Sequence, residues 1–351
     1  MDAADLSVGP ADEGHHAPSA DPLWSESLYL NFAARDGVLG GFVRFARHPT
    51  RKQTEALICV YLPGGGIGIN LIYDVFEQPD ERTTRAGAAA FVCVDPLKHC
   101  RVTFDGELFV FTDPALVAGA LRPDAPKMPG RRVRFELDAI GIHPPFFYPG
   151  YKKVEEGPNH HPRAPFGFTR KLKRMIRRPA EILSALNMRQ ARHYEQSMIV
   201  RGSVVIDGEP LDFDGTGHRD HSWGPRDWMP SERWRWLTGE VDGMAFNAMY
   251  LTIAGSHVTN GYVWKDGRFA SVDQLRLEST FDDTGLGART LSAELTAGGV
   301  TYAITGETLM NVPLPIVGDH FFTIYNVGRT RYRCGDRTGW GVAEFVERLD
   351  P

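Results

Sequence analysis

Short, evenly spaced turn signals run along most of the chain and restrict what it can fold into. Pairs of turn residues separate runs in which apolar and polar side chains alternate. These pairs are Asp36-Gly37, Asp105-Gly106, Asp207-Gly208, Asp242-Gly243, Asp266-Gly267 and Gly298-Gly299. Such pairs favour two-residue hairpins, and the alternation is typical of a strand buried on one face. The pattern therefore predicts an all-β fold of antiparallel hairpins, as in a sandwich or a barrel.

Differences in composition divide the 351 residues into four parts. Residues 1–22 are acidic, polar and rich in Ala, Gly and Pro, so we expect them to form a disordered tail. Residues 23–155 and residues 193–351 both carry repeated strand patterns, and each is long enough to bury its own core. We therefore predict two antiparallel β domains of similar size, joined by residues 156–192.

The joining segment is the one place where helical periodicity is convincing. A Pro-rich loop comes first, and Leu172, Met175 and Ile176 then make an apolar stripe at helical spacing. Six of the nine residues from Arg170 to Arg178 are basic. This helical linker has two interpretations: a solvated basic face, or a docking site for a membrane surface or another anionic partner.

Charge and hydropathy exclude several classes of protein. The net charge of −5 gives no general nucleic-acid footprint, so no nucleic-acid partner is expected. No apolar run is long enough for a transmembrane helix. The N-terminus lacks the basic and apolar regions of a signal peptide, so we expect a cytoplasmic protein.

Cysteine and glycine patterns point to structure rather than to cofactors. The four cysteines form no C-x-x-C pair, which argues against zinc or redox use. Cys59 and Cys93 lie in apolar strand-like runs and are expected to be buried free thiols. The glycines from Gly64 to Gly68 lack the Lys-Ser/Thr of a phosphate loop and the helix of a dinucleotide site. They predict a tight hairpin turn instead.

Residues 215–228, GTGHRDHSWGPRDW, concentrate charges and aromatic rings. If this segment is an extended strand, its side chains point alternately to opposite faces. One face then carries His218, Asp220 and Ser222, and the other carries Arg219, His221 and Trp223. A regular strand cannot bring both sets into one pocket unless a β-bulge intervenes.

This segment has a structural and a functional interpretation. In the structural one, Arg219 or Arg226 neutralises a nearby aspartate and the tryptophans belong to the core. Buried charges are costly without compensation, however, and such density is typical of a functional site. A metal site is not expected, because His218 and His221 point to opposite faces of a strand. Ser222 is not expected to be a nucleophile, because the G-x-S-x-G turn is missing.

The same segment resembles the carotenoid 1,2-hydratase/AttH-like superfamily. The resemblance rests on GTGHRDHSWGPRDW, preceded by HYEQ and GSVVIDG, and it extends from WSESLYLNF to GWGVAEFVER. It is strongest to a bacterial branch in which an RDHSWG-RDW segment opens the second barrel. The resemblance implies two lipocalin-like antiparallel β-barrels in tandem, with the motif in the C-terminal barrel, residues 193–351.

The resemblance also implies roles for individual residues. His221 and Trp223 match the His-x-Trp of the hydratases, and Asp220 matches the acidic residue before it. The hydratases carry an aromatic and an acidic residue on the following strand as well. That strand reads GMAFNAMYL here, with Asn247 and Tyr250 but no carboxylate. This departure counts against a carotenoid as substrate and leaves acid–base chemistry on another apolar molecule.

Acid–base chemistry suits these residue types. An aspartic acid in a dry pocket could protonate a carbon–carbon double bond, because burial raises the pKa of its carboxyl group. Aromatic faces could stabilise the resulting carbocation, His221 could shuttle the proton, and Arg219 could anchor an oxygenated head group. The predicted catalytic residues are Asp220, His221 and Asp227, and the predicted substrate-binding residues are Arg219, Trp223, Trp228, Asn247 and Tyr250.

These residues predict an enzyme, a lyase or an isomerase, that acts without metal or organic cofactor on a hydrophobic terpenoid, steroid or polyketide-like molecule. Attack of water on the cation gives hydration, and the reverse gives dehydration. Loss of a different proton gives isomerisation, and internal attack gives cyclisation. The alternative is a non-catalytic protein that binds a lipophilic ligand within a barrel.

Overall fold

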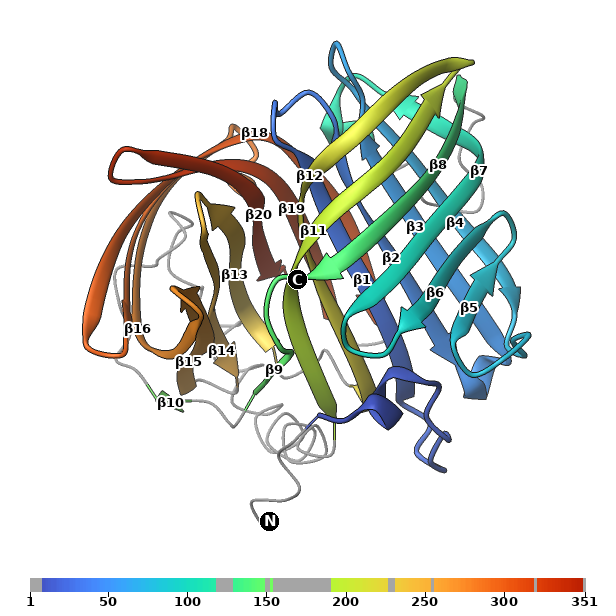
Figure 1. The fold of residues 1–351 in the computed structure, drawn as a ribbon, viewed down its shortest axis with the longest axis horizontal. Helices are drawn as coiled ribbons and strands as arrows, with labels where there is room; N and C mark the ends of the chain where they lie inside the picture. The colour runs from blue at the N-terminus through green and yellow to red at the C-terminus, as the bar shows by residue number, and fades with distance from the viewer. Residues whose placement is uncertain are drawn as a thin grey trace. The chain divides into compact units, whose positions relative to one another are not determined.

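The computed structural model describes residues 8–117, 129–148, 152–153, 191–226, 231–253, 256–318 and 321–349. Antiparallel strands joined by turns make up most of this part of the chain, which confirms the all-β prediction (Figure 1). The strands divide between two compact units, Met1–Pro149 with Ala191–Arg226, and Gly150–Gln190 with Asp227–Pro351. Within the described ranges, no helix is long and apolar enough to cross a membrane.

The first unit is a sheet that closes into a barrel. Its strands are β1 (Trp24–Ala34), β2 (Gly40–His48), β3 (Gln53–Tyr61), β4 (Ile67–Val75), β5 (Thr83–Ala86), β6 (Ala89–Asp95), β7 (His99–Phe111), β8 (Gly130–Gly141), β9 (Phe146–Phe147), β11 (Arg192–Ile206) and β12 (Glu209–Pro225). They pair in the order β4-β3-β2-β1-β12-β11-β8-β7-β6-β5, and β9 pairs with β11. Because β4 also pairs with β7, the path from β4 to β7 closes into a ring.

The hairpin of β11 and β12 belongs to this first barrel, which corrects the expected boundary at residue 193. β12 pairs with β1 and β11 pairs with β8, so the hairpin fills the gap between those two strands. The motif is therefore not part of the C-terminal barrel, whose strands, apart from β10 (Lys152–Lys153), follow Asp227. Strand patterns show where β structure resumes along the chain. They give no local signal for which other strand each one pairs with, so the barrel that a strand joins cannot be read from them.

Residues 8–22 are not the disordered tail that composition suggested. A 3-10 turn covers Pro10–Glu13, and the His15 amide donates to the Glu81 carbonyl oxygen at 2.9 Å. Glu13 is only 6% exposed. This segment is held by polar contacts and therefore needs few apolar residues. Its composition for that reason resembles the composition of a disordered tail. Residues 1–7 lie outside the described part of the chain.

The second unit is a closed barrel. Its strands are β10 (Lys152–Lys153), β13 (Ser231–Val241), β14 (Met244–Ile253), β15 (Ser256–Lys265), β16 (Arg268–Phe281), β17 (Ala288–Ala297), β18 (Val300–Gly318), β19 (Phe321–Cys334) and β20 (Arg337–Arg348). Their order is β10-β15-β14-β13-β20-β19-β18-β17-β16, and a β15–β16 pairing closes the ring. The structure does not describe residues 154–190. The expected Pro-rich loop and the helical linker with Arg170–Arg178 fall within this range.

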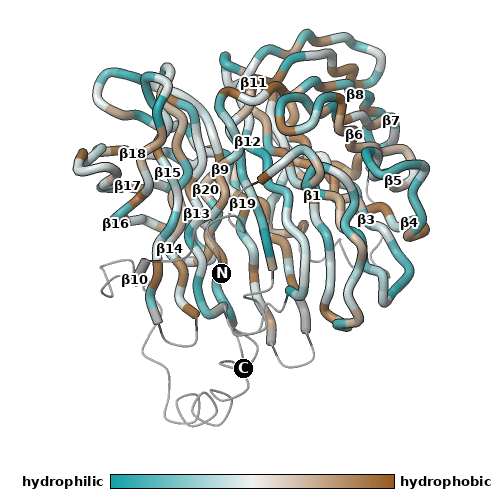
Figure 2. Tube along the Cα trace, turned by 60° about the horizontal axis from the view of Figure 1, so that its bottom comes forward, coloured by the Kyte–Doolittle hydropathy of each residue, from teal (hydrophilic) through white to brown (hydrophobic). Residues whose placement is uncertain are grey.

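Alternate residues of the strands build one apolar core in each unit. Leu28, Leu30 and Phe32 of β1 point into the first core, and alternate residues of β14 point into the second. Polar and apolar residues are accordingly interleaved along the strands (Figure 2). Cys59 and Cys93 are buried free thiols, as predicted. Each barrel is therefore held together by burial of its own inward-facing side chains.

Most predicted turns are confirmed. Turns occur at Asp36-Gly37, Asp207-Gly208, Asp242-Gly243, Asp266-Gly267 and Gly298-Gly299, and in the glycine run from Gly64. Asp207 and Gly208 have φ angles of 51° and 90°, as a two-residue hairpin requires. The turn expected at Asp105-Gly106 is wrong, because both residues lie within β7. Gly106 instead leaves room for the ring of Phe104, whose Cζ would lie 2.6 Å from an added Cβ.

Candidate functional site

Strand β12 carries the motif with no break in its pairing to β1 or β11. Its side chains therefore alternate strictly, as predicted, and the two sets of polar residues are separated. The inner set is Arg219, His221 and Trp223, and the outer set is His218, Asp220 and Ser222. Phe213, at an inner position of the same strand, lies in the core of the first barrel. The predicted catalytic residues Asp220 and His221 therefore lie on opposite faces of β12, because adjacent residues of a strand diverge.

On the inner face, Arg219 forms a buried ion pair with Glu13. Its Nη1 and Nη2 lie 2.6 Å and 3.2 Å from the two carboxylate oxygens of Glu13. Its Nε donates to Gln196 Oε1 at 2.8 Å, and the Tyr194 hydroxyl donates to Glu13 at 2.8 Å. Burial alone would raise the pKa of Glu13, but the adjacent guanidinium of Arg219 holds that pKa below its ordinary value. The charges of this pair therefore compensate each other.

His221 belongs to the same inner network. Its Nε2 lies 3.1 Å from Glu26 Oε1, and His16 Nδ1 lies 2.8 Å from the same oxygen. Arg47 donates to the other oxygen of Glu26. The ring of His16 stacks on that of Trp223 with centroids 3.9 Å apart. Burial would raise the pKa of Glu26, but the hydrogen bonds from both histidines and the charge of Arg47 lower it.

On the outer face, four polar side chains form the group that we call the Asp220 cluster. Asp220 on β12 stands directly opposite Glu195 on β11. His218 Nε2 lies 2.7 Å from Glu195 Oε2, and His193 Nε2 lies 3.8 Å from Glu195 Oε1. Glu195 and His218 are buried, whereas Asp220 is partly exposed. Two carboxyl groups therefore face each other across neighbouring strands.

The pKa values of the Asp220 cluster follow from this arrangement. Burial, and next the negative charge of Glu195, raises the pKa of Asp220 to about 6. Burial lowers the pKa of His218 and that of His193 to about 3. Both imidazole rings are therefore neutral at pH 7, whereas the carboxyl group of Asp220 changes its protonation state close to that pH.

Two groups of described residues could hold a metal ion. The ligand atoms of His16, Glu26 and His221 lie within 4.8 Å of one another, and so do those of His193, Glu195 and Asp220. In the first group, both imidazoles already share one carboxylate oxygen and Arg47 adds a positive charge. Hydrogen bonds account for these contacts, and the donor set beside a guanidinium does not favour a cation.

The other predicted residues lie in the second unit. Asn247 and Tyr250 are both fully buried on β14, and Tyr250 belongs to the apolar core. The Tyr250 hydroxyl lies 2.9 Å from His257 Nδ1. Asn247 and Tyr250 point to opposite faces of β14, because they are three positions apart along the strand. Asp227 and Trp228 lie outside the described residues.

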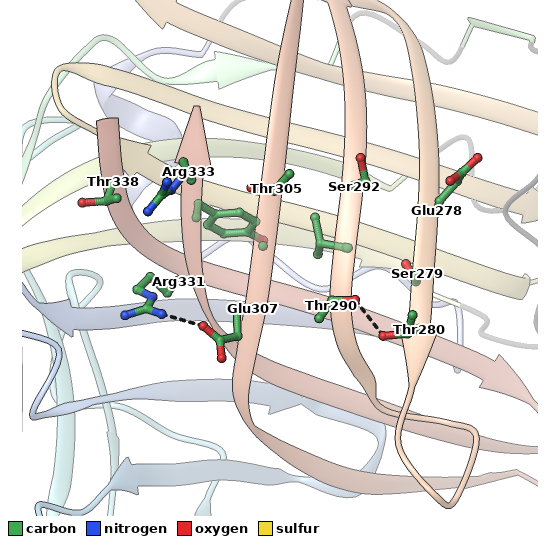
Figure 3. A pocket seen from close by; sticks show the side chains of 13 residues that line it. Glu278, Ser279, Thr280, Thr290, Ser292, Thr305, Glu307, Arg331, Arg333 and Thr338 are labelled. Atoms are coloured by element: carbon green, nitrogen blue, oxygen red, sulfur yellow. Dashed lines mark hydrogen bonds and ion pairs between the residues drawn. The ribbon is translucent and has the colours of Figure 1, made fainter. Parts of the chain in front are cut away.

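The second unit also has a groove of about 730 Å³ that the sequence patterns did not indicate (Figure 3). Its lining is rich in hydroxyl groups, from Ser279, Thr280, Thr290, Ser292, Thr305 and Thr338. Within this lining, an Arg331–Glu307 ion pair of 2.6 Å and a Thr280–Thr290 hydrogen bond of 2.7 Å each join two neighbouring strands. Hydroxyl groups are therefore numerous in this lining, which also includes the buried side chains of Leu291 and Tyr332.

Sequence patterns missed the acidic partners of the motif. Glu195 lies in HYEQ and Glu26 in WSES. Each is a charged residue within a strand that also contains apolar residues. Across the ladder, Glu195 faces Asp220 and Glu26 faces Trp223. A search for charges on strands that could pair with the motif would have found both. Glu13 had no such signal, because it lies in a polar segment without strand alternation.

A closed antiparallel barrel in each of two units, one of them bearing a charged strand, defines a tandem β-barrel protein. The chain belongs to the family described as "Domain of unknown function (DUF7064)", which matches residues 9–348. A search among curated proteins finds no significant match.

Solved structures of similar fold cover nearly the whole chain. A protein assigned as AttH from Nitrosomonas europaea has a TM-score of 0.61 and 14% identity, over 98% of both chains. CghA with Sch210972 has a TM-score of 0.54 and 15% identity, over 98% of this chain and 96% of that one. Kievitone hydratase from Nectria haematococca has a TM-score of 0.52 and 11% identity, over 92% of this chain and 88% of that one. The resemblance to the AttH-like superfamily is confirmed at the level of the fold.

Proposed function

We propose that the protein is a cofactor-independent acid–base enzyme that acts on a hydrophobic molecule, with Asp220 as its proton donor and acceptor. The observation that carries this proposal is the carboxyl group of Asp220. It is partly exposed on the outer face of β12, and burial together with Glu195 raises its pKa to about 6. A carboxyl group of this kind gives and takes protons near neutral pH.

The proposed chemistry is proton transfer to or from carbon. With a pKa of about 6, roughly a tenth of Asp220 is protonated at pH 7. The protonated group delivers its proton to a carbon–carbon double bond, and the carboxylate then removes a proton from the cation or from an attacking water. Hydration, isomerisation and cyclisation differ in what this cation meets next. Dehydration runs the hydration in reverse: the protonated group gives its proton to a leaving hydroxyl, water departs, and the carboxylate removes a proton from the adjacent carbon.

The neighbours of Asp220 act as positioning residues in this proposal. Glu195 supports the raised pKa of Asp220 by its charge, and His218 holds Glu195 in place at 2.7 Å. Arg219 and His221 have a structural role here, because both are tied into the inner network of the first barrel.

The comparisons support the reaction class and the substrate class. One protein of similar fold is named a hydratase, for kievitone, and another is seen with the ligand Sch210972. By that likeness, the substrate is a terpenoid, steroid or polyketide-like molecule with an apolar body. The reaction is then that of a lyase or an isomerase.

The test begins with the substrate. The purified protein is extracted with organic solvent, and any co-purifying molecule is identified by mass spectrometry. That molecule is returned to the protein in D2O, and mass spectrometry follows conversion and deuterium uptake at carbon. We expect Asp220→Asn to lower the rate by about 10²–10⁴-fold, the range typical of a lost general acid or base.

Asp214→Asn is the matched control, since it removes a carboxylate from the same strand at a position that is half exposed and paired with Arg201. It should leave the rate unchanged. Full activity of Asp220→Asn in a folded protein would refute the proposed role of Asp220.

A second candidate is a protein that binds a lipophilic ligand without turning it over. The observation in its favour is that Arg219 and His221 are paired within the first barrel, as expected if the motif only stabilises strands. Under this function, the extracted molecule returns unchanged from D2O with the wild type and with Asp220→Asn alike.

A further inference from the structure

The carboxylate of Glu13 lies in a site built by another part of the chain. Two guanidinium nitrogens of Arg219 bind its two oxygens, the Tyr194 hydroxyl donates to one of them, and the backbone N–H of Leu97 donates to the other. Arg219 is 2% exposed and Tyr194 is fully buried. Convergent donors of this kind, with a bidentate arginine at the centre, are the geometry by which proteins bind carboxylates.

The segment that brings Glu13 to this site is held mainly by polar contacts. His15 Nε2 lies 2.8 Å from Thr84 Oγ1, and the main chain and ring of His16 contact Glu26. Val8 is the residue of this segment that packs on a described apolar cluster, that of Trp24, Tyr194 and Trp223. Departure of the segment would uncover the face of Trp223 under His16 and the contact with Val8, whereas its other named contacts are polar and can be replaced by water.

The contacts of Glu13 can be replaced by those of another carboxylate. A buried ion pair is weak evidence for stability, because the desolvation of both charges offsets their attraction. A ligand carboxylate on Arg219 would restore the same hydrogen bonds and leave no buried charge unpaired. A planar ring on that ligand would take the place of the His16 ring on Trp223, where the interplanar angle is now 9°.

We propose that Arg219, Tyr194 and the Leu97 amide form a carboxylate-binding site, that Glu13 occupies it as an internal ligand, and that residues 8–16 form a plug which an aromatic carboxylate displaces. The site lies on the inner face of the first barrel and does not involve Asp220. Because the plug competes, the affinity of the wild type for such a ligand is reduced by the fraction of time for which the site is open.

The first experiment measures binding to the full-length protein by calorimetry, with 3-phenylpropionate as the probe. Glu13→Ala removes the internal ligand and should bind the probe at least about tenfold more tightly than the wild type. Asp21→Ala, which removes an acidic residue outside the site, should bind like the wild type. The neutral 3-phenylpropanamide should show no gain with Glu13→Ala, because it lacks the charge that pairs with Arg219.

The second experiment uses the wild type and does not depend on the folding of a variant. Hydrogen exchange at the His16 amide, which donates to Glu26 at 3.1 Å, reports whether the plug is seated. Saturating 3-phenylpropionate should accelerate this exchange by about tenfold or more, and 3-phenylpropanamide should not. The proposal is overturned if exchange at His16 stays the same at saturation, if Glu13→Ala gains no affinity, or if the amide binds as well as the acid.

Discussion

The two faces of β12 carry similar residue types and have opposite electrostatic properties. On the inner face Arg219 pairs with the opposite charge of Glu13, and His221 is hydrogen-bonded to Glu26. On the outer face Asp220 meets Glu195, a like charge, and its pKa rises to about 6. A single alternating strand thus separates a set of paired groups from a carboxyl group with a raised pKa, and the proposed function rests on the second.

Breaking the inner pair should have the largest effect on stability. Arg219→Ala leaves the Glu13 carboxylate without its partner, and we expect a loss of up to about 3–5 kcal/mol in the free energy of unfolding, the upper value applying if residues 8–16 stay in place. Urea denaturation measures the loss. Arg201→Ala is the control: its side chain is 63% exposed and pairs with Asp214, so the loss should stay below about 1 kcal/mol. Similar losses of unfolding free energy for the two variants would contradict the expected difference between the buried and the exposed ion pair.

Removing the outer carboxylate should change how stability depends on pH. The pKa of Asp220 is about 6 in the folded protein against an ordinary value of 3.8, so the folded state binds this proton more tightly than the unfolded chain does. The resulting stabilisation is complete below pH 4 and lost above pH 6. Relative to Asp220→Asn, the wild type should therefore lose up to about 3 kcal/mol across that range.

Urea denaturation at a series of pH values checks this dependence. Asp214→Asn sharpens the comparison, because the hydrogen bond from Arg201 lowers the pKa of Asp214 and reverses the sign. Relative to Asp214→Asn, the wild type should gain stability as the pH rises through the pKa of Asp214. If the stability of the wild type relative to each of the two variants changed with pH in the same direction, the assignment of a raised pKa to Asp220 would be contradicted.

A smaller effect is expected from Glu195→Gln, which removes the like charge and keeps the shape of the side chain. The pKa of Asp220 should move down toward its ordinary value, although burial still holds it up. Carbon-13 NMR of the Asp220 carboxyl group follows the titration directly. Glu209→Gln, an exposed change on the same strand, should leave the titration in place. No movement in Glu195→Gln would leave burial as the sole cause of the raised pKa.

Local patterns predicted the β fold, most turns and the division of the motif between two faces, because these depend on residues within a few positions of one another. The partners of the motif were not predictable in this way. Glu13 is 206 positions from Arg219, and Glu26 is 195 positions from His221. Strand alternation shows which side chains share a face, but it contains no information about which distant strand or segment will meet that face.

Some predictions concern parts of the chain for which the structure gives no description. Docking of the basic segment Arg170–Arg178 on an anionic surface stays a prediction, and so do the roles of Asp227 and Trp228. The cytoplasmic location likewise stays a prediction.

The place of β11 and β12 in the first barrel affects how the chain is made. β1 and β8 leave the ribosome well before the hairpin that joins them, so both present open strand edges to other chains during synthesis. A fragment that stops at residue 155 would keep those edges permanently and should aggregate or be retained by chaperones. Closure of the first barrel must wait until residue 225 has emerged, which makes this unit slow to fold for its size.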